Sequence, residues 1–599
     1  MENSSGTVAA AAFHPPVTGG AASSLDHRSE KDVSTETEAS SSTYDELGAN
    51  NSDVPTEKQH EAPETNRPAE DEHPEELNSR RKAIIVLALC LCVFLSALDQ
   101  TIITTAIPVI AGRFKSPAAY TWIGSSYLLA SAALLPSWGK FSDIWGRKPV
   151  LLSACIIFLI GSILCAAAQN IGMLLAGRVI QGIGAGGQLG LVNVTISDLI
   201  AVRERGIYLS YVGLTWAFAS AIGPVLGGVF TEKATWRLCF WINIPIGVIA
   251  ILGLVIFLHL ESPRISFSEG LLRVDWLGTA LIVSGTVLFL LGLEFGGVSH
   301  PWDSPMVLCC IIIGLLLVAT FVFVEWKIAK IPIMPLRLFN HRTNACCYLI
   351  GFLHGMIFIA GCYFIPLYFQ AARGDSALLS GVFVLPYVIV LSLVSAASGF
   401  LIARTGQYQQ VIWGGTAIMA LGIGLLVNLD RTSSWSKLAI YQILAGIGCG
   451  PLFQSPLIAI HATIDHKDVG TATTTFSFVR SLGTALAICI GLVVFQNMME
   501  NQSAELAASS LSREAVHAIS GSSAAASVGY VQQLPEEQKI IAQDAYAKAL
   551  STMWYFFMAV AILAVFASIG IGRHHLSDKV ESAQPAKARK SRKKSEEAV

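Results

Sequence analysis

Three ionisable residues stand inside long apolar runs of the sequence, where charged side chains are rare. Asp99 lies in the run 83–107, Arg178 in the run 171–197 and Arg480 in the run 470–496. Ionisable groups at membrane depth are energetically costly and are functional candidates by default. A carboxylate beside a guanidinium can exchange its proton, because a nearby positive charge shifts the pKa. We therefore take these three residues as candidates for proton coupling.

The depths of Asp99 and Arg178 match if successive runs cross a membrane in alternate directions. Asp99 is about 16 residues from one side and Arg178 about seven from the other, at about 1.5 Å per residue. In an apolar layer about 30 Å thick, the two side chains can therefore face one another or share a water network. A static ion pair that holds two helices together is the alternative. Arg480 falls near the midplane without an obvious acidic neighbour, so it lines a cavity or binds a carbonyl oxygen.

The elements that carry these residues are predicted to be membrane-spanning helices. The chain has 599 residues, of which 53% are hydrophobic and only 14% charged, with a mean hydropathy of +0.56. Apolar runs of about 20 residues cross a bilayer as helices, which satisfy their own backbone. Such runs lie at roughly 83–107, 120–138, 150–168, 171–197, 207–230, 238–259, 275–296, 306–326, 345–369, 379–402, 410–428, 438–460, 470–496 and 551–572. We predict an all-α integral membrane protein with 14 transmembrane helices.

The flanking charges and the terminal segments predict the orientation. Lys and Arg favour the cytoplasmic side, which places both termini inside the cell. Residues 1–78 are acidic and poor in aromatic residues, which predicts a disordered cytoplasmic tail. Residues 573–599 form a basic cytoplasmic tail, and 497–550 is the one long outer loop. This outer loop contains Asn501, the first residue of a glycosylation sequon. The sequon lies so close to a span that we do not expect Asn501 to be glycosylated.

A faint internal repeat divides the spans. "GKFSDIWGRK" from Gly139 pairs with "GFLIARTGQY" from Gly399, and "QGIGAGG" from Gln181 with "AGIGCGP" from Ala445. Transporters are often built from such duplicated halves. We predict a six-helix half at 79–260 (spans 1–6), a linker with the inserted hairpin of spans 7 and 8 at 261–343, and a second six-helix half at 344–572 (spans 9–14).

Two glycine-marked segments are candidates for conformational change. In "GKFSDIWGRKP", Gly139 and Gly146 allow a tight turn, and Asp143 can lie near a helix N-terminus of the other half. Arg147 belongs to the same cytoplasmic turn, for which a pure topology signal is the alternative. In span 5, Gly223 and Gly227 allow close helix approach and Pro224 bends the helix, with Gly228 beside them. Plain packing is the alternative there.

Six motifs, in order, resemble the major facilitator superfamily. "GKFSDIWGRKP" is similar to its signature loop between helices 2 and 3. "LDQTIITTAIP" (98–108), "AGRVIQGIGAGG" (176–187) and "AIGPVLGG" (221–228) resemble motifs of helices 1, 4 and 5 in its fourteen-span drug:proton antiporter family. "WRLCFWINIPIG" (236–247) and "FVRSLGTALAI" (478–488) are also similar to that family. The resemblance covers about residues 80–572, and the tail and long outer loop look like those of fungal toxin and multidrug exporters.

The resemblance implies proton-coupled efflux of amphipathic small molecules such as toxins, secondary metabolites or drugs. It also implies roles for the Asp99 and Arg178 positions in coupling, for Asp143 in a contact between the halves, and for the span-5 motif as a seal. A siderophore or basic amino-acid carrier and a transporter-like nutrient sensor are the alternatives.

The remaining expectations concern the chemistry and the setting of the protein. We expect no enzyme activity, because hydrolase and nucleotide-binding motifs are absent from the sequence. The 12 cysteines lie in apolar segments without metal-ligand spacing, so we expect neither disulfides nor a metal site. We expect no cofactor beyond a proton gradient, no nucleic acid, and a monomer in the plasma membrane, with a vacuolar or vesicle membrane as the alternative.

Overall fold

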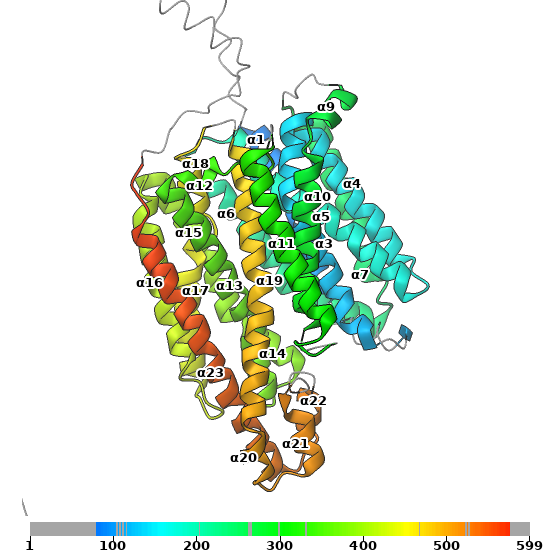
Figure 1. Cartoon of the computed structure of the whole chain (residues 1–599), viewed down its shortest axis with the longest axis vertical. Coiled ribbons are helices and arrows are strands. Elements are labelled where there is room, and N and C mark those ends of the chain that lie inside the picture. Colours follow the sequence, from blue (N-terminus) through cyan, green and yellow to red (C-terminus); the bar gives the residue numbers. More distant parts are fainter. Residues whose placement is uncertain are drawn as a thin grey trace, which may run out of the picture. The chain divides into compact units, whose positions relative to one another are not determined.

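The computed structural model describes residues 79–574 with short gaps, and it is helical almost throughout (Figure 1). The gaps are at 104–105, 107–109, 111–112, 115–116, 203, 261–265, 297–299, 330–331, 466–467, 522–523 and 525–526. Residues 1–78 and most of the predicted basic tail, 575–599, lie outside the described residues. Across the described ranges, the β-type pairing is an isolated bridge between Gly296 and His300. The predicted all-α membrane class is confirmed.

The first group of helices occupies the range predicted for the first half. Its members are α1 (Ser79–Ile102), α3 (Pro117–Trp145), α4 (Arg147–Ala166), α5 (Ile171–Leu199), α6 (Arg205–Lys233), α7 (Leu238–Trp241) and α8 (Asn243–Phe257). The predicted hairpin follows after α9 (Phe267–Arg273) as α10 (Trp276–Phe295) and α11 (Pro305–Lys327). The division of the chain at residues 260 and 343 stays a prediction.

The second group begins with α12 (Arg337–Asn340). Its longer helices include α13, α15, α16, α17, α19 and α23. The bounds are α13 (Arg342–Ala371), α14 (Ala377–Phe383), α15 (Leu385–Thr405), α16 (Tyr408–Leu426), α17 (Trp435–Cys449), η1 (Gly450–Phe453), α18 (Ser455–His461), α19 (Val469–Asn501), α20 (Ser503–Ala507), α21 (Arg513–Ile519), α22 (Val528–Val531) and α23 (Glu536–Ile569). Helix α3 packs against α19 and α6 packs against α15, which joins the two groups.

The described residues include 13 helices that are long and apolar enough to cross a membrane. They match 13 of the 14 predicted spans. Helix α3, which contains the predicted span 120–138, is not among them. It carries Pro136 and several serines, which lower its hydropathy. The exact count of fourteen spans therefore stays a prediction.

Several spans are interrupted where prolines prevent a regular backbone hydrogen bond. The predicted span 438–460 consists of α17, the 3₁₀ turn η1 and α18, with Pro451 and Pro456 at the two joints. The predicted span 379–402 is divided into α14 and α15, with Pro386 in the first turn of α15. These interruptions place irregular backbone at membrane depth, which transporters use where it lines a site.

The predicted outer loop 497–550 is largely helical. Helix α19 has 33 residues and α23 has 34, about 50 Å each at 1.5 Å per residue, so both exceed an apolar layer of about 30 Å. Figure 1 shows the three short helices α20, α21 and α22 together at the far end of α19. Tyr546 of α23 donates to the carbonyl of Ala524 at 2.6 Å and fixes this segment. A hydropathy pattern does not indicate these helices, because they have only four to seven residues each.

Candidate functional site

A buried ion pair joins α1 to α5 in the first group of helices. The Nη1 of Arg178 donates to the Oδ2 of Asp99, and neither residue is exposed to solvent. The guanidinium also donates from Nε to the carbonyl of Ile123 at 2.9 Å. Its face lies 4.4 Å from the ring centroid of Tyr127. The structure thus brings together the two residues that the sequence places at similar depth.

Two amide side chains hold the other oxygen of Asp99. The Nε2 of Gln181 and the Nδ2 of Asn243 each donate to Oδ1 at 2.8 Å. Both amides also donate to the hydroxyl of Ser162, at 2.8 and 3.3 Å. The Oε1 of Gln181 accepts from Arg178 at 3.0 Å. Three helices, α1, α5 and α8, therefore meet at one carboxylate, and α4 joins the network through Ser162.

Glycines allow these helices to come close enough for the network to form. A Cβ added at Gly161 of α4 would meet the backbone nitrogen of Gln181, and one at Gly182 of α5 would meet the carbonyl of Tyr127. Asn170 caps the N-terminus of α5, because its side chain accepts from the Met173 nitrogen at 2.8 Å. Close backbone approach thus positions the polar groups of "AGRVIQGIGAGG".

Some contacts of this network do not involve Asp99. The guanidinium of Arg178 also binds the carbonyl of Ile123 and the Oε1 of Gln181, which attaches α5 to α3. The Oδ1 of Asn243 has no hydrogen-bond partner among the described residues.

The sequence did not identify Gln181, Asn243 or Ser162 as site residues. Placing a neutral amide or hydroxyl at membrane depth costs far less free energy than placing a charge there. The sequence pattern therefore does not mark such residues as functional candidates. Gln181 lies one helical turn after Arg178, which places the two side chains on the same face of the helix. That spacing was the sequence signal from which a contact between them could have been predicted.

Arg480 of α19 occupies a different region. Its Nη1 donates to the carbonyl of Phe453 at 3.3 Å, and the guanidinium carbon lies 5.5 and 5.6 Å from the rings of Phe453 and Phe476. The side chain is partly exposed. No carboxylate in the described part of the chain forms an ion pair with it. Arg480 therefore lies apart from the pair Asp99–Arg178 and binds a carbonyl oxygen.

The turn between α3 and α4 carries a second charged cluster. Arg147 donates to Asp143, and its Nε donates to Asp198 of α5 at 2.6 Å. The other oxygen of Asp143 accepts from the hydroxyl of Thr471 at 2.8 Å, in the first turn of α19. Asp143 thus lies at a helix N-terminus of the other group, where a negative charge is favourable. Asp198 was not singled out in the sequence.

The two glycines of this turn are needed for different geometric reasons. Gly146 has a φ of 93°, a conformation that residues with a Cβ rarely adopt, and it precedes the first residue of α4. A Cβ at Gly139 would collide with the side chain of Thr474 in α19. Gly146 therefore permits the turn, and Gly139 permits contact between the two groups of helices.

The remaining predicted residues lie elsewhere. In α6, a Cβ at Gly223 would collide with Thr101 of α1, Gly227 is buried, and Gly228 has open space around it. This part of α6 therefore contacts its own group. The side chain of Pro224 lies outside the described residues. Asn501 is the last residue of α19 and is exposed.

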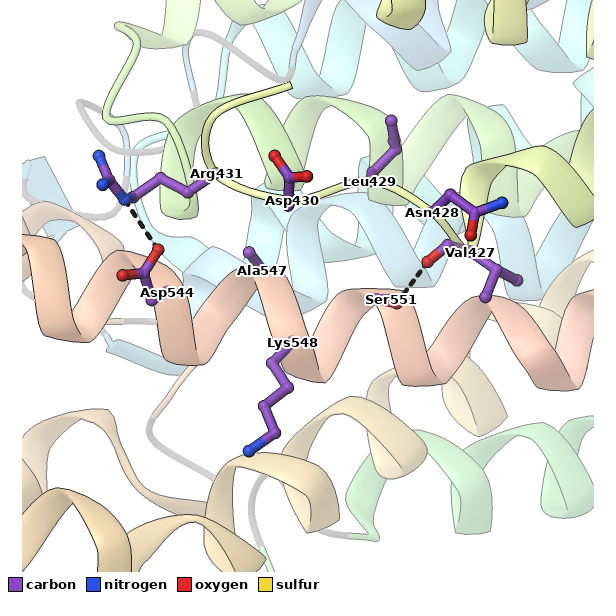
Figure 2. Close-up of a pocket in the computed structure, with 9 residues that line it drawn as sticks. All are labelled: Val427, Asn428, Leu429, Asp430, Arg431, Asp544, Ala547, Lys548 and Ser551. Carbon is purple, nitrogen blue, oxygen red and sulfur yellow. Dashed lines mark hydrogen bonds and ion pairs between the residues drawn. The ribbon is translucent and has the colours of Figure 1, made fainter. Parts of the chain in front are cut away.

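A surface pocket lies between the α16–α17 connection and α23, at the predicted outer ends (Figure 2). Its lining residues are Val427, Asn428, Leu429, Asp430, Arg431, Asp544, Ala547, Lys548 and Ser551. Arg431 pairs with Asp544 at 2.8 Å, as Figure 2 shows. Burial raises the pKa of Asp430, but hydrogen bonds from Thr432 and Ser433 outweigh it and hold that pKa below its usual value. These charges are paired at the surface, so we do not take the pocket as the site.

The long apolar helices are those of a multi-pass membrane protein. The chain belongs to the major facilitator superfamily, whose family model matches residues 89–488. It is 45% identical to "Efflux pump dotC" of Dothistroma septosporum over 495 residues, 83% of this chain and 85% of that one. It is 34% identical to "Efflux pump FUS6" of Gibberella fujikuroi over 506 residues, 84% and 91% of the two chains.

Solved structures share the same fold. The proton:xylose symporter XylE aligns with a TM-score of 0.53 and 14% identity, over 82% of this chain and 95% of that one. At this identity the likeness concerns the fold alone. The family model and the curated relatives confirm the predicted resemblance to the major facilitator superfamily and to fungal efflux pumps.

Proposed function

We propose that this chain is a secondary active transporter that exports amphipathic small molecules, such as toxins, secondary metabolites or drugs, in exchange for protons. The observation that carries the proposal is the buried carboxylate of Asp99, held by Arg178, Gln181 and Asn243. The relatives named as efflux pumps support the direction of transport. We place the protein in the plasma membrane with both termini in the cytoplasm, as a monomer, and keep a vacuolar or vesicle membrane as the alternative.

The contacts between the two groups of helices support alternating access. Besides the bond from Thr471 to Asp143, Ser210 of α6 donates to the carbonyl of Ser395 at 3.2 Å. Gln454 donates to the carbonyl of Leu209 at 3.2 Å. These contacts lie at the predicted cytoplasmic ends. We interpret the structure as the form that is closed toward the cytoplasm.

Proton binding at Asp99 then provides the coupling. An ionised Asp99 keeps α1 and α8 attached to α5, and protonation loosens this attachment. The helices can rearrange only after Asp99 has exchanged its contact with Arg178 for a proton. This exchange links proton uptake to substrate release. At about 100 mV, one inward positive charge supplies about 2.3 kcal/mol.

Inside-out vesicles with an acidic interior test this proposal. The unaltered chain should accumulate a substrate from a panel of toxins, drugs and siderophores and dissipate the imposed pH gradient. Asp99→Asn should bind substrate but lose gradient-driven accumulation, because the amide cannot exchange a proton. Asp544→Asn, which removes an exposed carboxylate, is the control and should behave like the unaltered chain.

The alternatives give different results in the same assay. A siderophore or basic amino-acid carrier would respond to that class of compound alone. A nutrient sensor would not dissipate the gradient and would keep signalling in the Asp99→Asn variant. If no compound dissipates the gradient, the antiport mechanism is wrong.

A further inference from the structure

The interrupted helix of the second group exposes a backbone carbonyl at membrane depth. Helix α17 ends at Cys449, η1 turns through Gly450–Phe453, and α18 begins at Ser455. Pro456, in the first turn of α18, has no N–H to donate to this turn. The carbonyl of Phe453 accepts from Arg480 at 3.3 Å. Interrupted helices of this kind mark binding sites in transporters.

Arg480 brings a positive charge that no neighbouring carboxylate neutralises. The carboxylates of the described spans have partners of their own. Asp99 pairs with Arg178 and Asp198 with Arg147, while Glu294 accepts from Ser125 at 2.5 Å and Glu325 from the backbone nitrogen of Ile333 at 2.8 Å. A lone cation in a low-dielectric setting attracts an anion far more strongly than it would in water.

Aromatic rings extend from Arg480 toward the first group of helices. Phe453 packs edge-on against His354 at 4.7 Å and against Phe358 at 4.9 Å. Phe358 in turn contacts Trp216 of α6 at 5.5 Å. The row of rings therefore contains residues from both groups and provides flat apolar faces beside the guanidinium.

His354 adds a hydrogen-bond acceptor to this region. Its Nε2 lies 3.1 Å from the carbonyl of Cys449, and because a carbonyl only accepts, Nε2 carries the proton. In the neutral ring, Nδ1 is then an acceptor. Nδ1 has no partner among the described residues, and His354 is fully buried. A substrate hydroxyl is a group that such an acceptor can bind.

We infer that Arg480, Phe453, Phe358 and Trp216 bind an aromatic organic anion, whose carboxylate or phenolate pairs with Arg480. The inference rests on the proposed export function and specifies its substrate class. The membrane potential favours such a substrate, because an anion leaving the cytoplasm and a proton entering it both move positive charge inward. A cationic substrate would meet the repulsion of Arg480.

Two probes with one skeleton test the preference for anions. Fluorescein is an anion and rhodamine 123 a cation, and both are xanthenes. Their gradient-driven uptake into inside-out vesicles should be quantified by absorbance after extraction. The unaltered chain should prefer fluorescein. Arg480→Gln should raise its KM about ten- to a hundredfold, the effect of one lost charge-assisted hydrogen bond, and should not impair rhodamine 123.

Two further variants separate charge from position. Arg480→Lys keeps the charge without the planar fork and should retain part of the fluorescein uptake. Arg431→Gln removes an arginine from the outer surface and should change neither probe. Equal loss of both probes in Arg480→Gln would show that Arg480 has only a structural role, and preference for rhodamine 123 by the unaltered chain would overturn the inference.

Binding to the purified full chain in lipid nanodiscs separates this inference from the proposed function. Fluorescein anisotropy should report binding that Arg480→Gln weakens and that needs no gradient. Binding without gradient-driven uptake would contradict the antiport mechanism and leave the anion site in place. Absence of fluorescein binding by the unaltered chain would overturn the anion site.

Discussion

The turns that begin at Gly139 and Gly399 share a glycine skeleton but differ in charge. Gly146 and Gly406 both have a positive φ, 93° and 68°, at the same point of each turn. A Cβ at Gly139 would collide with Thr474 of α19, and one at Gly399 with the carbonyl of Gly206 in α6. Both turns therefore allow close contact with a helix of the other group.

The ion pair of Asp143 and Arg147 has no counterpart at the matching positions of the second turn, where the charged residue is Arg404. Asp143 and Arg147 bind Asp198 and the first turn of α19, whereas Ala403 and Gln407 occupy the corresponding places of the second turn. One contact between the groups thus combines packing with a charged cluster, while the other is close backbone packing. The glycine positions are shared between the repeats, whereas the pair Asp143–Arg147 is found in the first turn.

The same asymmetry recurs inside the helices. The offset of 264 relates residues 181–187 to residues 445–451. At this offset, Gln442 of α17 is the counterpart of Arg178 in the repeat. Arg178 has an anionic partner, whereas both polar atoms of Gln442 are buried without a partner among the described residues. The comparison suggests that the first group handles the proton and the second, through Arg480, the substrate.

The largest expected effect follows from Arg178→Leu. Loss of the guanidinium leaves Asp99 buried with amide donors only, which should cost about 3–5 kcal/mol of stability. Thermal unfolding in detergent should show a lower midpoint, and gradient-driven transport should be lost. Adding Asp99→Asn removes the uncompensated charge, so the double variant should regain stability but not transport. Unchanged stability of Arg178→Leu would show that Asp99 is not ionised in this form.

The two glycine contacts should respond differently to one methyl group. Gly139→Ala and Gly399→Ala should each disfavour the closed form by about 1–3 kcal/mol, as overpacking does, and slow transport. Thr474→Ala should rescue part of the Gly139→Ala defect, because the side chain of Thr474 is the obstacle. Gly399→Ala has no such rescue, since a backbone carbonyl is the obstacle. Substrate flux into vesicles should be measured for both glycine variants and for the rescue by Thr474→Ala. Normal flux in Gly399→Ala would contradict the prediction that this contact is tightly packed.

A smaller effect is expected from Asp143→Asn. The side chains of Asp143 and Arg147 are only 19% and 16% exposed, so the amide loses an attraction of about 1 kcal/mol to Arg147 and to the N-terminus of α19. Transport should fall several-fold while the protein inserts and folds normally, as judged by surface abundance and unfolding midpoint. Thr471→Val should act in the same direction and more weakly. Normal flux in Asp143→Asn would leave this turn with a topological role alone.

Hydropathy and the cost of buried charge were enough to predict the helical class, most spans and the depth of Asp99 and Arg178. They could not predict Asn243, because its contact with Asp99 depends on how α8 rotates about its axis. Nor could they predict the turn at η1, where Pro451 and Pro456 interrupt the predicted span 438–460. The roles of Asp99 and Asp143 stay proposals.

The smallest effect is expected at Gln442. A buried amide without partners costs about 1–3 kcal/mol, so Gln442→Leu should leave transport unchanged and raise the unfolding midpoint or leave it as it is. Gln181→Leu is the matched control in α5 and should impair transport, because Gln181 binds Asp99. If Gln442→Leu abolished transport as Arg178→Leu does, the second group would also contain a working polar centre. Proton handling would then be divided between the halves, and the asymmetry would be limited to the cytoplasmic turns.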